Sequence, residues 1–227
     1  DLIQLSHIAL NLIGEGFVYY SDKRVLASEL LLKLNIKPLK LKLRDGLALI
    51  NGTSCMTGIS AINIIYSTRL INWSLVCSSM LNEIVESFND SFSKELNDAK
   101  LHPGQKEVAL FMRDFLKDSK LIRNREQFYK NSSELKKQRL KQKLQEYYSI
   151  RCIPQIIGPI LDTLNYSKKV VENELNSTND NPIICIENNN VYHGGNFHGD
   201  YISLEMDKLK IAICKLSMLA ERQLNFL

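Results

Sequence analysis

The chain has 227 residues, of which 44% are hydrophobic and 24% are charged, and its formal net charge is +4. This composition is typical of a folded, largely helical protein, and so small a charge does not indicate a nucleic-acid partner. A basic run over residues 136–143 contains no aromatic residue, which favours a solvated helix face over a phosphate-binding patch.

The first quarter of the chain contains one clear helical pattern and one short alternating pattern. Apolar residues recur at helical spacing over residues 2–13, and Gly14 and Gly16 end that pattern. The strict alternation in LKLKL after Pro38 predicts a short, half-exposed strand. The stretch DGLALINGTS, residues 45–54, is expected to form a turn, a buried run and a second turn.

Longer helices are expected over the middle of the chain. Residues 56–88 are apolar at helical spacing, AKLHPGQ at residues 99–105 breaks this pattern, and residues 108–116 predict another helix. A very long helix is predicted from about residue 133 to about residue 176, with a kink near Pro154.

The last part of the chain predicts a hairpin and a final helix. In NPIICIENNNVYHGG, residues 181–195, two short apolar runs flank NNN as the turn. Residues 199–223 have the spacing of a helix. The expected fold class is therefore mainly α, with small β excursions. The chain begins and ends inside helical patterns, so we expect it to be the central segment of a longer protein.

Cysteine spacing and hydropathy suggest a location. The five cysteines are widely spaced and form no CxxC pair, so free thiols in a reducing cytoplasm explain them most simply. No apolar run approaches the roughly 20 residues that a membrane helix needs, and no signal peptide is visible. We therefore expect a cytoplasmic protein without a membrane partner.

Arg151 is the most informative polar residue, because it interrupts an apolar pattern in YYSIRCIPQIIGP. An arginine in such a place often packs its stem and keeps its charged group in water. Gln145 and Tyr148 precede it at spacings of i−6 and i−3, which would place all three on one broad helix face. The alternative is therefore that Arg151 points into a site.

Other polar residues stand beside turn-forming sequence. Asn51 precedes a glycine and Asn181 precedes a proline, so each is consistent with a simple turn. The segment HGGNFHGD contains Phe197 between two histidines. His193 and His198 have no third ligand at a convincing spacing, so we predict no metal site.

Six motifs occur together and in order: DLIQLSHIALNLIGEG, RDGLALINGTSCMTGI, HPGQ, QEYYSIRCIPQIIGPILDTL, ELNSTNDNPII and HGGNFHGDYISLEMDKLKIA. This series closely resembles the aromatic amino acid ammonia-lyases, which include the histidine, tyrosine and phenylalanine lyases and related aminomutases. The resemblance extends over residues 1–227. It implies a bundle of very long helices of the fumarase/aspartase-like superfamily, assembled as a homotetramer whose active sites combine residues from three subunits.

The resemblance also implies a cofactor. The family cyclises an Ala-Ser-Gly tripeptide of its own backbone into 4-methylidene-imidazol-5-one (MIO), and Asp-Leu normally follows that tripeptide. Here Asp1 and Leu2 match Asp-Leu, and no Ala-Ser-Gly occurs in the chain. We therefore expect the tripeptide directly before Asp1, and the family's catalytic tyrosine base and later C-terminal site residues in other segments.

Roles carry over to individual residues through the motifs. A planar guanidinium binds a carboxylate through two parallel hydrogen bonds, and the resemblance assigns this contact with the substrate to Arg151. It places Asn51, Gln145 and Tyr148 around MIO, together with Asn181, which also assists carboxylate binding.

Two further roles complete the site that the resemblance implies. Phe197 is expected to pack beside MIO, and Asp1, which follows it in the chain, is expected to aid cyclisation. Helix N-termini are expected to point at MIO and to add positive potential.

The substrate is the least determined property. NGTSCMTG looks like the tyrosine lyases and aminomutases, and QEYYSIRCIPQ looks most like bacterial tyrosine ammonia-lyases. Elimination of ammonia from L-tyrosine to trans-p-coumarate therefore ranks first. Histidine lyase, phenylalanine lyase and tyrosine 2,3-aminomutase remain as alternatives. An inactive helical scaffold of the same fold, or a plain helical interaction module, would need no such set of polar residues.

Overall fold

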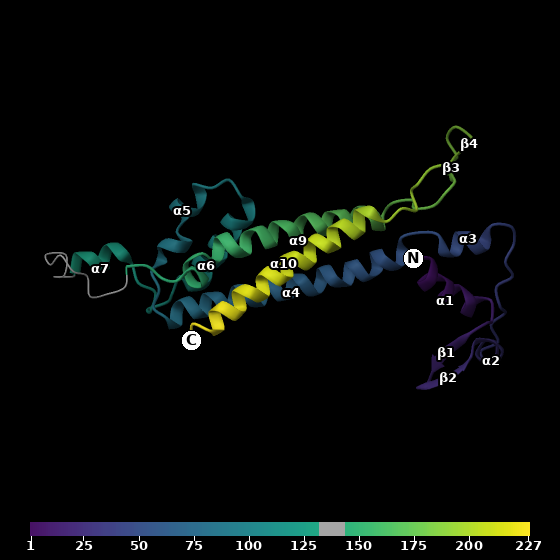
Figure 1. The fold of residues 1–227 in the computed structure, drawn as a ribbon, viewed down its shortest axis with the longest axis horizontal. Helices are drawn as coiled ribbons and strands as arrows, with labels where there is room; N and C mark the ends of the chain where they lie inside the picture. The colour runs from purple at the N-terminus through teal and green to yellow at the C-terminus, as the bar shows by residue number, and fades with distance from the viewer. Residues whose placement is uncertain (132–143) are drawn as a thin grey trace. The chain divides into compact units, whose positions relative to one another are not determined.

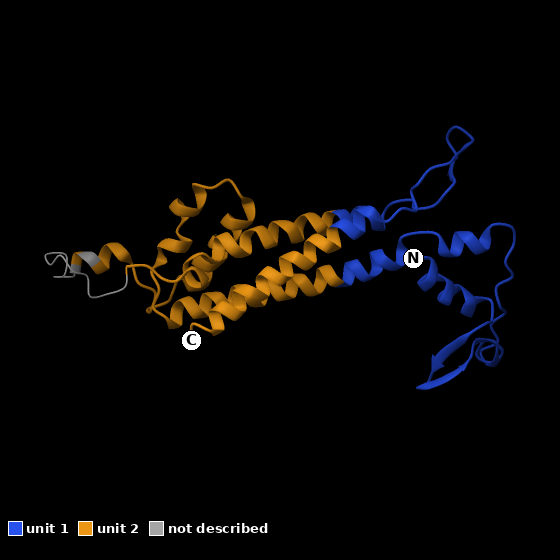
Figure 2. Ribbon diagram, in the orientation of Figure 1, with its two compact units in different colours: residues 1–62, 170–204 blue, residues 63–169, 205–227 orange. Residues whose placement is uncertain are grey.

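The computed structural model describes residues 1–131 and 144–227. The chain is mainly α with two small hairpins, which confirms the expected fold class (Figure 1). It divides into two compact units, residues 1–62 with 170–204 and residues 63–169 with 205–227 (Figure 2). The basic run at residues 136–143 and the predicted start of a helix near residue 133 lie outside the described residues.

In the first unit, helix α1 spans Leu2–Leu12, as predicted. Gly14 has a φ of +87°, and its N–H donates to Asn11 O, while the N–H of Glu15 donates to Leu10 O. This pair of hydrogen bonds is a Schellman motif, in which a left-handed residue satisfies the last carbonyls of a helix. Glycine adopts that conformation without steric cost, which is why the helix ends here.

A hairpin that the sequence patterns did not predict follows α1. Strands β1 (Phe17–Tyr20) and β2 (Lys23–Leu26) pair antiparallel, with Tyr20 opposite Lys23. The two turn residues, Ser21 and Asp22, both have positive φ, as a type I′ turn requires. Helix α2 (Ala27–Lys33) follows directly.

The strand predicted at residues 39–43 is wrong, because the structure has no strand there. A strand needs a neighbouring strand for its backbone groups, and this segment makes a single backbone bond to α1, from Leu39 N to Leu12 O at 2.8 Å. The turn and buried run expected after it instead form helix α3 (Asp45–Ile50). The carboxylate of Asp45 accepts a hydrogen bond from Lys42 N at 2.8 Å and so closes the turn before the helix.

The second hairpin was predicted correctly. Strands β3 (Ile183–Cys185) and β4 (Asn190–Tyr192) pair antiparallel, with Cys185 opposite Asn190. The asparagine-rich stretch therefore forms the end of the turn and the start of the second strand.

Three long helices supply the core of the second unit: α4 (Ser54–Ile84), α9 (Ile153–Leu175) and α10 (Asp200–Leu224). Their buried residues recur three or four residues apart, which is the spacing of a packed helix seam. Buried positions with this spacing within the unit include Ile64, Ser67, Ile71, Leu75, Ser78 and Asn82 on α4; Ile153, Ile157, Ile160, Leu164 and Ser167 on α9; and Glu205, Leu209, Ala212, Leu216, Leu219 and Gln223 on α10. Ser167 Oγ donates to Glu205 at 3.1 Å, and Gln223 Nε2 donates to Ser78 Oγ at 2.9 Å.

Shorter helices complete the second unit: η1 (Asn89–Phe92), α5 (Lys94–Asp98), α6 (Pro103–Leu116), α7 (Arg125–Asn131) and α8 (Tyr148–Arg151). Helix α6 begins in the HPGQ motif, where Gly104 N donates to the carboxylate of Asp162 at 2.8 Å. Gly104 and Gly158 face each other where α6 meets α9, so closely that a Cβ on either would collide with the other helix.

The single long helix predicted through Tyr148 to Asn176 is wrong at its start. Residues 144–147 are not helical, α8 ends at Arg151, and α9 begins separately at Ile153. Proline lacks the N–H that a helix interior requires but is tolerated in a first turn. Pro154 therefore starts a new helix and does not kink a continuous one.

Two expectations about location can be compared with the structure. All five cysteines are free thiols, as expected. The helical stretch 45–84 is long and apolar enough to cross a membrane by length and composition only, a test that the core helix of a soluble protein also passes. Absence of a membrane partner stays a prediction.

The contact between α6 and α9 gives a prediction of stability. An added Cβ at Gly158 would lie 2.6 Å from Gln105 N and 2.7 Å from Gln105 Cα, and backbone atoms cannot move away cheaply. We expect Gly158→Ala to lower the free energy of unfolding by about 1–3 kcal/mol, measured by thermal and denaturant unfolding of the full-length protein. Gly58→Ala is the control, because nothing lies within 4 Å of the added atom. Equal stability of both variants would contradict the prediction.

Candidate active site

The predicted site residues form two groups, one in each unit. Gln145, Tyr148 and Arg151 belong to the second unit, whereas the other predicted residues belong to the first. Tyr148 and Arg151 both lie on α8, and the guanidinium carbon of Arg151 is 4.8 Å from the centre of the Tyr148 ring. Gln145 precedes the helix in a bend, so the prediction that all three residues share one helix face is wrong for Gln145.

Arg151 is a half-buried cation without an acidic partner in the described part of the chain. Its Nε is buried and donates no hydrogen bond to any described residue. A buried polar group without a partner is costly, so this arrangement is unfavourable unless another group completes it. The neighbouring residue Tyr148 is 70% exposed. Arg151 and Tyr148 together can therefore bind a planar anion, with the guanidinium as its partner and the aromatic ring beside it.

Buried polar residues of the core fix the position of α8. A helix of four residues leaves most of its carbonyls without local partners; here the N–H of Cys152 donates to Tyr148 O at 2.9 Å, and the carbonyls of Ser149 and Ile150 bind elsewhere. Gln223 Nε2 donates to Ser149 O at 3.0 Å, and Asn82 Nδ2 donates to Ile150 O at 3.4 Å. Asn82 is fully buried and also accepts a hydrogen bond from Ser87 Oγ at 2.7 Å. Two core helices, α4 and α10, thus hold the short helix that carries Arg151.

Sequence reasoning missed Asn82 and Gln223 as supports of the site. Both occupy core-facing positions in the three-and-four spacing of their helices. A polar residue at such a position needs a buried hydrogen-bond partner, and that requirement is the sequence feature that could have identified them.

In the first unit, Asp1 caps the N-terminus of α4. Its carboxylate accepts a hydrogen bond from Met56 N at 2.8 Å, within the first turn of this 31-residue helix. The free N–H groups of a helix N-terminus carry a partial positive charge of about 0.5 elementary charges. The start of α4 is therefore a positively polarised place that attracts and orients an acidic group.

Asn51 and the segment before Pro182 lie beside the same helix start. Asn51 ends α3, with its N–H donating to Leu47 O at 2.9 Å. The next residue, Gly52, packs on the backbone of Asn179, whose carbonyl oxygen would be 3.3 Å from an added Cβ. Just before α4, Thr53 Oγ1 donates to Glu174 at 2.5 Å.

Asn181 holds two loops together. Its Oδ1 accepts a hydrogen bond from Gly194 N at 2.8 Å, which ties it to the loop after β4. Its carbonyl accepts a hydrogen bond from Arg44, which also pairs with Asp180 at 3.0 Å. Asn181 is half-buried, and its Nδ2 group donates to no described residue.

Phe197 lies in the loop that precedes α10, and its side chain is 37% exposed. Two residues later, Gly199 packs so closely on Met56 that an added Cβ would collide with the sulfur. The loops that carry Asp1, Asn51, Asn181 and Phe197 therefore converge on the start of α4. Among residues 1–131 and 144–227, no group of three or more metal-ligating side chains is placed to hold an ion.

Comparison with known proteins gives a consistent result. Tyrosine 2,3-aminomutase of Myxococcus sp. (strain Mx-B0) is 38% identical over 230 residues, which cover 99% of this chain and 44% of that protein. Tyrosine ammonia-lyase of Cupriavidus metallidurans is 39% identical over 234 residues, 99% of this chain and 43% of that protein. The crystal structure of a tyrosine aminomutase from Streptomyces globisporus matches with a TM-score of 0.91 at 38% identity, over 99% of this chain and 44% of that one.

The chain therefore spans less than half the length of these relatives. The matched span covers 99% of this chain and so extends over both units. The family model for aromatic amino acid lyases matches residues 1–227. From this match and from the identity to its relatives, the chain belongs to the aromatic amino acid lyase family.

Proposed function

We propose that the full-length protein eliminates ammonia from an aromatic L-amino acid, with L-tyrosine as the first candidate and trans-p-coumarate as its product. The observation that carries this proposal is Arg151 beside Tyr148, within the segment QEYYSIR, with a buried Nε that has no hydrogen-bond partner among the described residues. An α-amino acid brings the carboxylate that such a guanidinium lacks.

Arg151 would bind the substrate carboxylate through its planar fork. Two parallel hydrogen bonds fix the orientation of the substrate as well as its charge. Because Asn82 and Gln223 hold α8 from the core, the guanidinium is positioned before substrate arrives. Tyr148 would then face the reacting part of the substrate, and Gln145 would contribute its amide nearby.

The group around the start of α4 would face the cofactor. The family match supports an MIO formed from Ala-Ser-Gly directly before Asp1, and its chemistry is that of an electrophilic alkene that makes the amino group of the substrate a better leaving group. The residues present fit such a group. Asp1 is anchored by Met56 N, Asn51 and Asn181 offer amides, and Phe197 offers a ring.

The α4 N-terminus would add positive potential beside the electrophile. Its partial charge is fixed by the backbone and needs no reorganisation during the reaction. Asp1 would serve two purposes here. Its carboxylate caps α4, and this bond would also keep the preceding backbone, which has to cyclise, in a fixed conformation.

Apolar surface supports the proposed homotetramer. No residue of α1 is buried in the described chain, although Leu2, Ile3 and Ile8 are apolar. A groove of about 700 Å³ also runs between α9 and α10, lined by apolar residues such as Ile156, Pro159 and Met218. We propose that other copies of the chain cover these surfaces, and that the catalytic base and selectivity residues come from segments outside this one.

The first prediction of this function is that the full-length protein contains MIO. Cyclisation of three residues with dehydration removes two waters, so the intact mass should fall by that amount relative to the encoded sequence. Borohydride, which reduces the alkene, should abolish activity, whereas mock-treated protein should retain it. An unmodified mass together with full turnover would overturn the cofactor assignment.

The second prediction concerns the carboxylate contact. Arg151→Ala should lower kcat/KM by roughly thirty-fold to several-thousand-fold, because loss of a buried charged partner costs about 2–5 kcal/mol. Arg151→Lys should also be poor, since lysine lacks the planar fork.

Arg69→Ala is the matched control for this prediction. Arg69 stands at the same i+3 spacing from a tyrosine, with its guanidinium carbon 5.9 Å from the Tyr66 ring, but it is exposed on α4. Steady-state kinetics of the three variants decide the role. Catalytic efficiency near that of wild type in Arg151→Ala would make Arg151 a packing residue with a solvated charge.

The third prediction is the substrate. NGTSCMTG and QEYYSIRCIPQ favour tyrosine, and the identities to an aminomutase and a lyase, 38% and 39%, are nearly equal. We expect L-tyrosine to give the highest kcat/KM among L-tyrosine, L-histidine and L-phenylalanine, with p-coumarate as the main product.

Product analysis separates the alternatives. Dominant urocanate would identify a histidine lyase, dominant cinnamate a phenylalanine lyase, and dominant β-tyrosine an aminomutase. Lyase and aminomutase differ in whether ammonia is released or returned to the β-carbon, which depends on how long the product stays enclosed. No turnover of any of the three would favour an inactive scaffold.

A further inference from the structure

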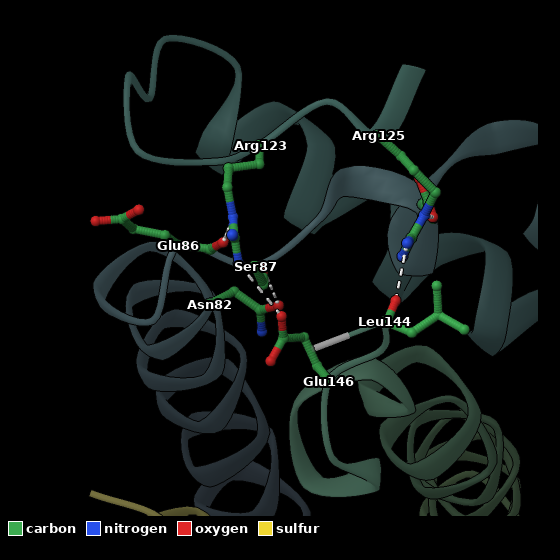
Figure 3. Close-up of polar contacts among 8 residues, drawn as sticks. Asn82, Glu86, Ser87, Arg123, Arg125, Leu144 and Glu146 are labelled. Carbon is green, nitrogen blue, oxygen red and sulfur yellow. Dashed lines mark hydrogen bonds and ion pairs between the residues drawn. The ribbon is translucent and has the colours of Figure 1, made fainter. Parts of the chain in front are cut away.

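Two arginines bind Leu144 and Glu146, the residues on either side of Gln145 (Figure 3). Arg125, the first residue of α7, donates from Nη1 to the carbonyl of Leu144 at 2.8 Å. Arg123 pairs through Nη2 with the carboxylate of Glu146 at 3.6 Å. The residues immediately before and after Gln145 are thus each bound by one guanidinium.

The two arginines are themselves firmly placed. Arg123 donates from its backbone N to Ser87 O at 2.9 Å, and its Nε donates to the carbonyl of Glu86 (Figure 3). Arg125 pairs with the carboxylate of Asp90. Both guanidiniums pack on the same buried ring, with their central carbons 4.6 Å and 4.1 Å from the centre of Phe88.

This arrangement matters because the segment before α8 has no secondary structure to hold it. Residues 144–147 belong to no helix or strand, so their backbone groups need partners from elsewhere. The Glu146 side chain is only 10% exposed, and a carboxylate so far buried is unstable without a positive partner. Arg125 supplies a hydrogen-bond donor to the carbonyl of Leu144, and Arg123 supplies the positive partner of the Glu146 carboxylate. These two residues lie on either side of Gln145.

We propose that Arg123 and Arg125 are positioning residues for the reaction, and that they act by fixing Gln145 against the start of α8. This inference rests on the proposed function, because it assumes that Gln145 serves the site. Neither arginine would touch substrate. Arg151 has separate supports in Asn82 and Gln223, so loss of the arginines should displace Gln145 and leave the carboxylate contact in place.

The first experiment measures kinetics on the full-length protein with the variants Arg125→Met, Arg123→Met, Glu146→Gln and the double variant Arg123→Met/Glu146→Gln. Rates are expressed per MIO group, measured by near-ultraviolet absorbance, so that unfolded or unmodified protein does not count. We expect kcat to fall about ten- to hundredfold, the size of effect that a 1 Å displacement of a catalytic group produces, while KM changes less than threefold.

The double variant tests whether Arg123 acts through Glu146. If it does, the double variant should be no slower than the worse single variant, because effects of residues in direct contact are not additive. If the fold losses of kcat of the two single variants multiply in the double variant, Arg123 and Glu146 act separately, and this part of the proposal is overturned. Arg113→Met is the control: Arg113 Nη1 donates to the carbonyl of Phe92 at 2.7 Å, and the contact does not involve residues 144–151.

Hydrogen exchange supplies a readout that does not depend on activity. Peptides within 144–151 should exchange faster in Arg125→Met and Glu146→Gln than in wild type or Arg113→Met, while the α9 and α10 peptides stay unchanged. If wild type turns over no aromatic amino acid, the proposed function fails, and exchange alone still decides whether the arginines hold this segment.

Three outcomes would overturn the proposal. The first is a kcat per MIO group within twofold of wild type in Arg125→Met and Glu146→Gln. The second is unchanged exchange over residues 144–151. The third is an equal loss of rate in Arg113→Met, which would show a general loss of stability.

Discussion

The structure depends on how the backbone of α8 is satisfied. Pro154 requires a new helix start, so the four residues Tyr148–Arg151 form a helix too short to pair most of its own carbonyls. Asn82 and Gln223 supply donors from the core. Polar groups in a core are unfavourable unless all are paired, and here the pairing extends through Ser78 and Ser87. The resulting network links the fold of the long helices to the place of Arg151.

This constraint explains why Arg151 can lie at the edge of a core without an acidic partner among residues 1–131 and 144–227. A guanidinium on a flexible segment would turn toward water or toward a carboxylate. On α8 the fixed backbone and the Tyr148 ring limit where it can go. An arginine held in this way loses little further freedom when an anion binds, and preorganisation of this kind favours binding. The start of α4 is preorganised in the same way, but there the groups held in place are backbone N–H donors and not a side chain.

Much of the fold could be predicted from the sequence because the core helices repeat apolar residues every three or four positions. The predictions of α1, α4, α6 and α10 rest on that spacing. The β1–β2 hairpin was missed because nearly all of its residues are exposed, so no alternation marks a buried face. LKLKL does alternate, but alternation does not supply the neighbouring strand that a β-structure needs.

The candidate site was predicted less evenly. Its residues could be named by resemblance, since their motifs occur in order, but the contacts that hold them could not. Asn82 and Gln223 were at least visible as polar residues in a core pattern. Nothing in the sequence marked Arg125 as a support of the site. Its bond to Leu144 joins residues that are 19 positions apart and belong to no common helical or strand pattern.

The Ser78–Gln223 pair has a consequence for how α4 and α10 align. Apolar seams with a three-and-four spacing repeat every seven residues, so such helices could pack equally well after sliding by one repeat. A slide of seven residues would move Gln223 by about 10 Å along the helix axis. Ser78 and the carbonyl of Ser149 would then lose their shared partner inside the core. Gln223 therefore sets the register of α4 against α10. Through its bond to Ser149 O, the same side chain also fixes where α8, and with it Arg151, lies along these helices.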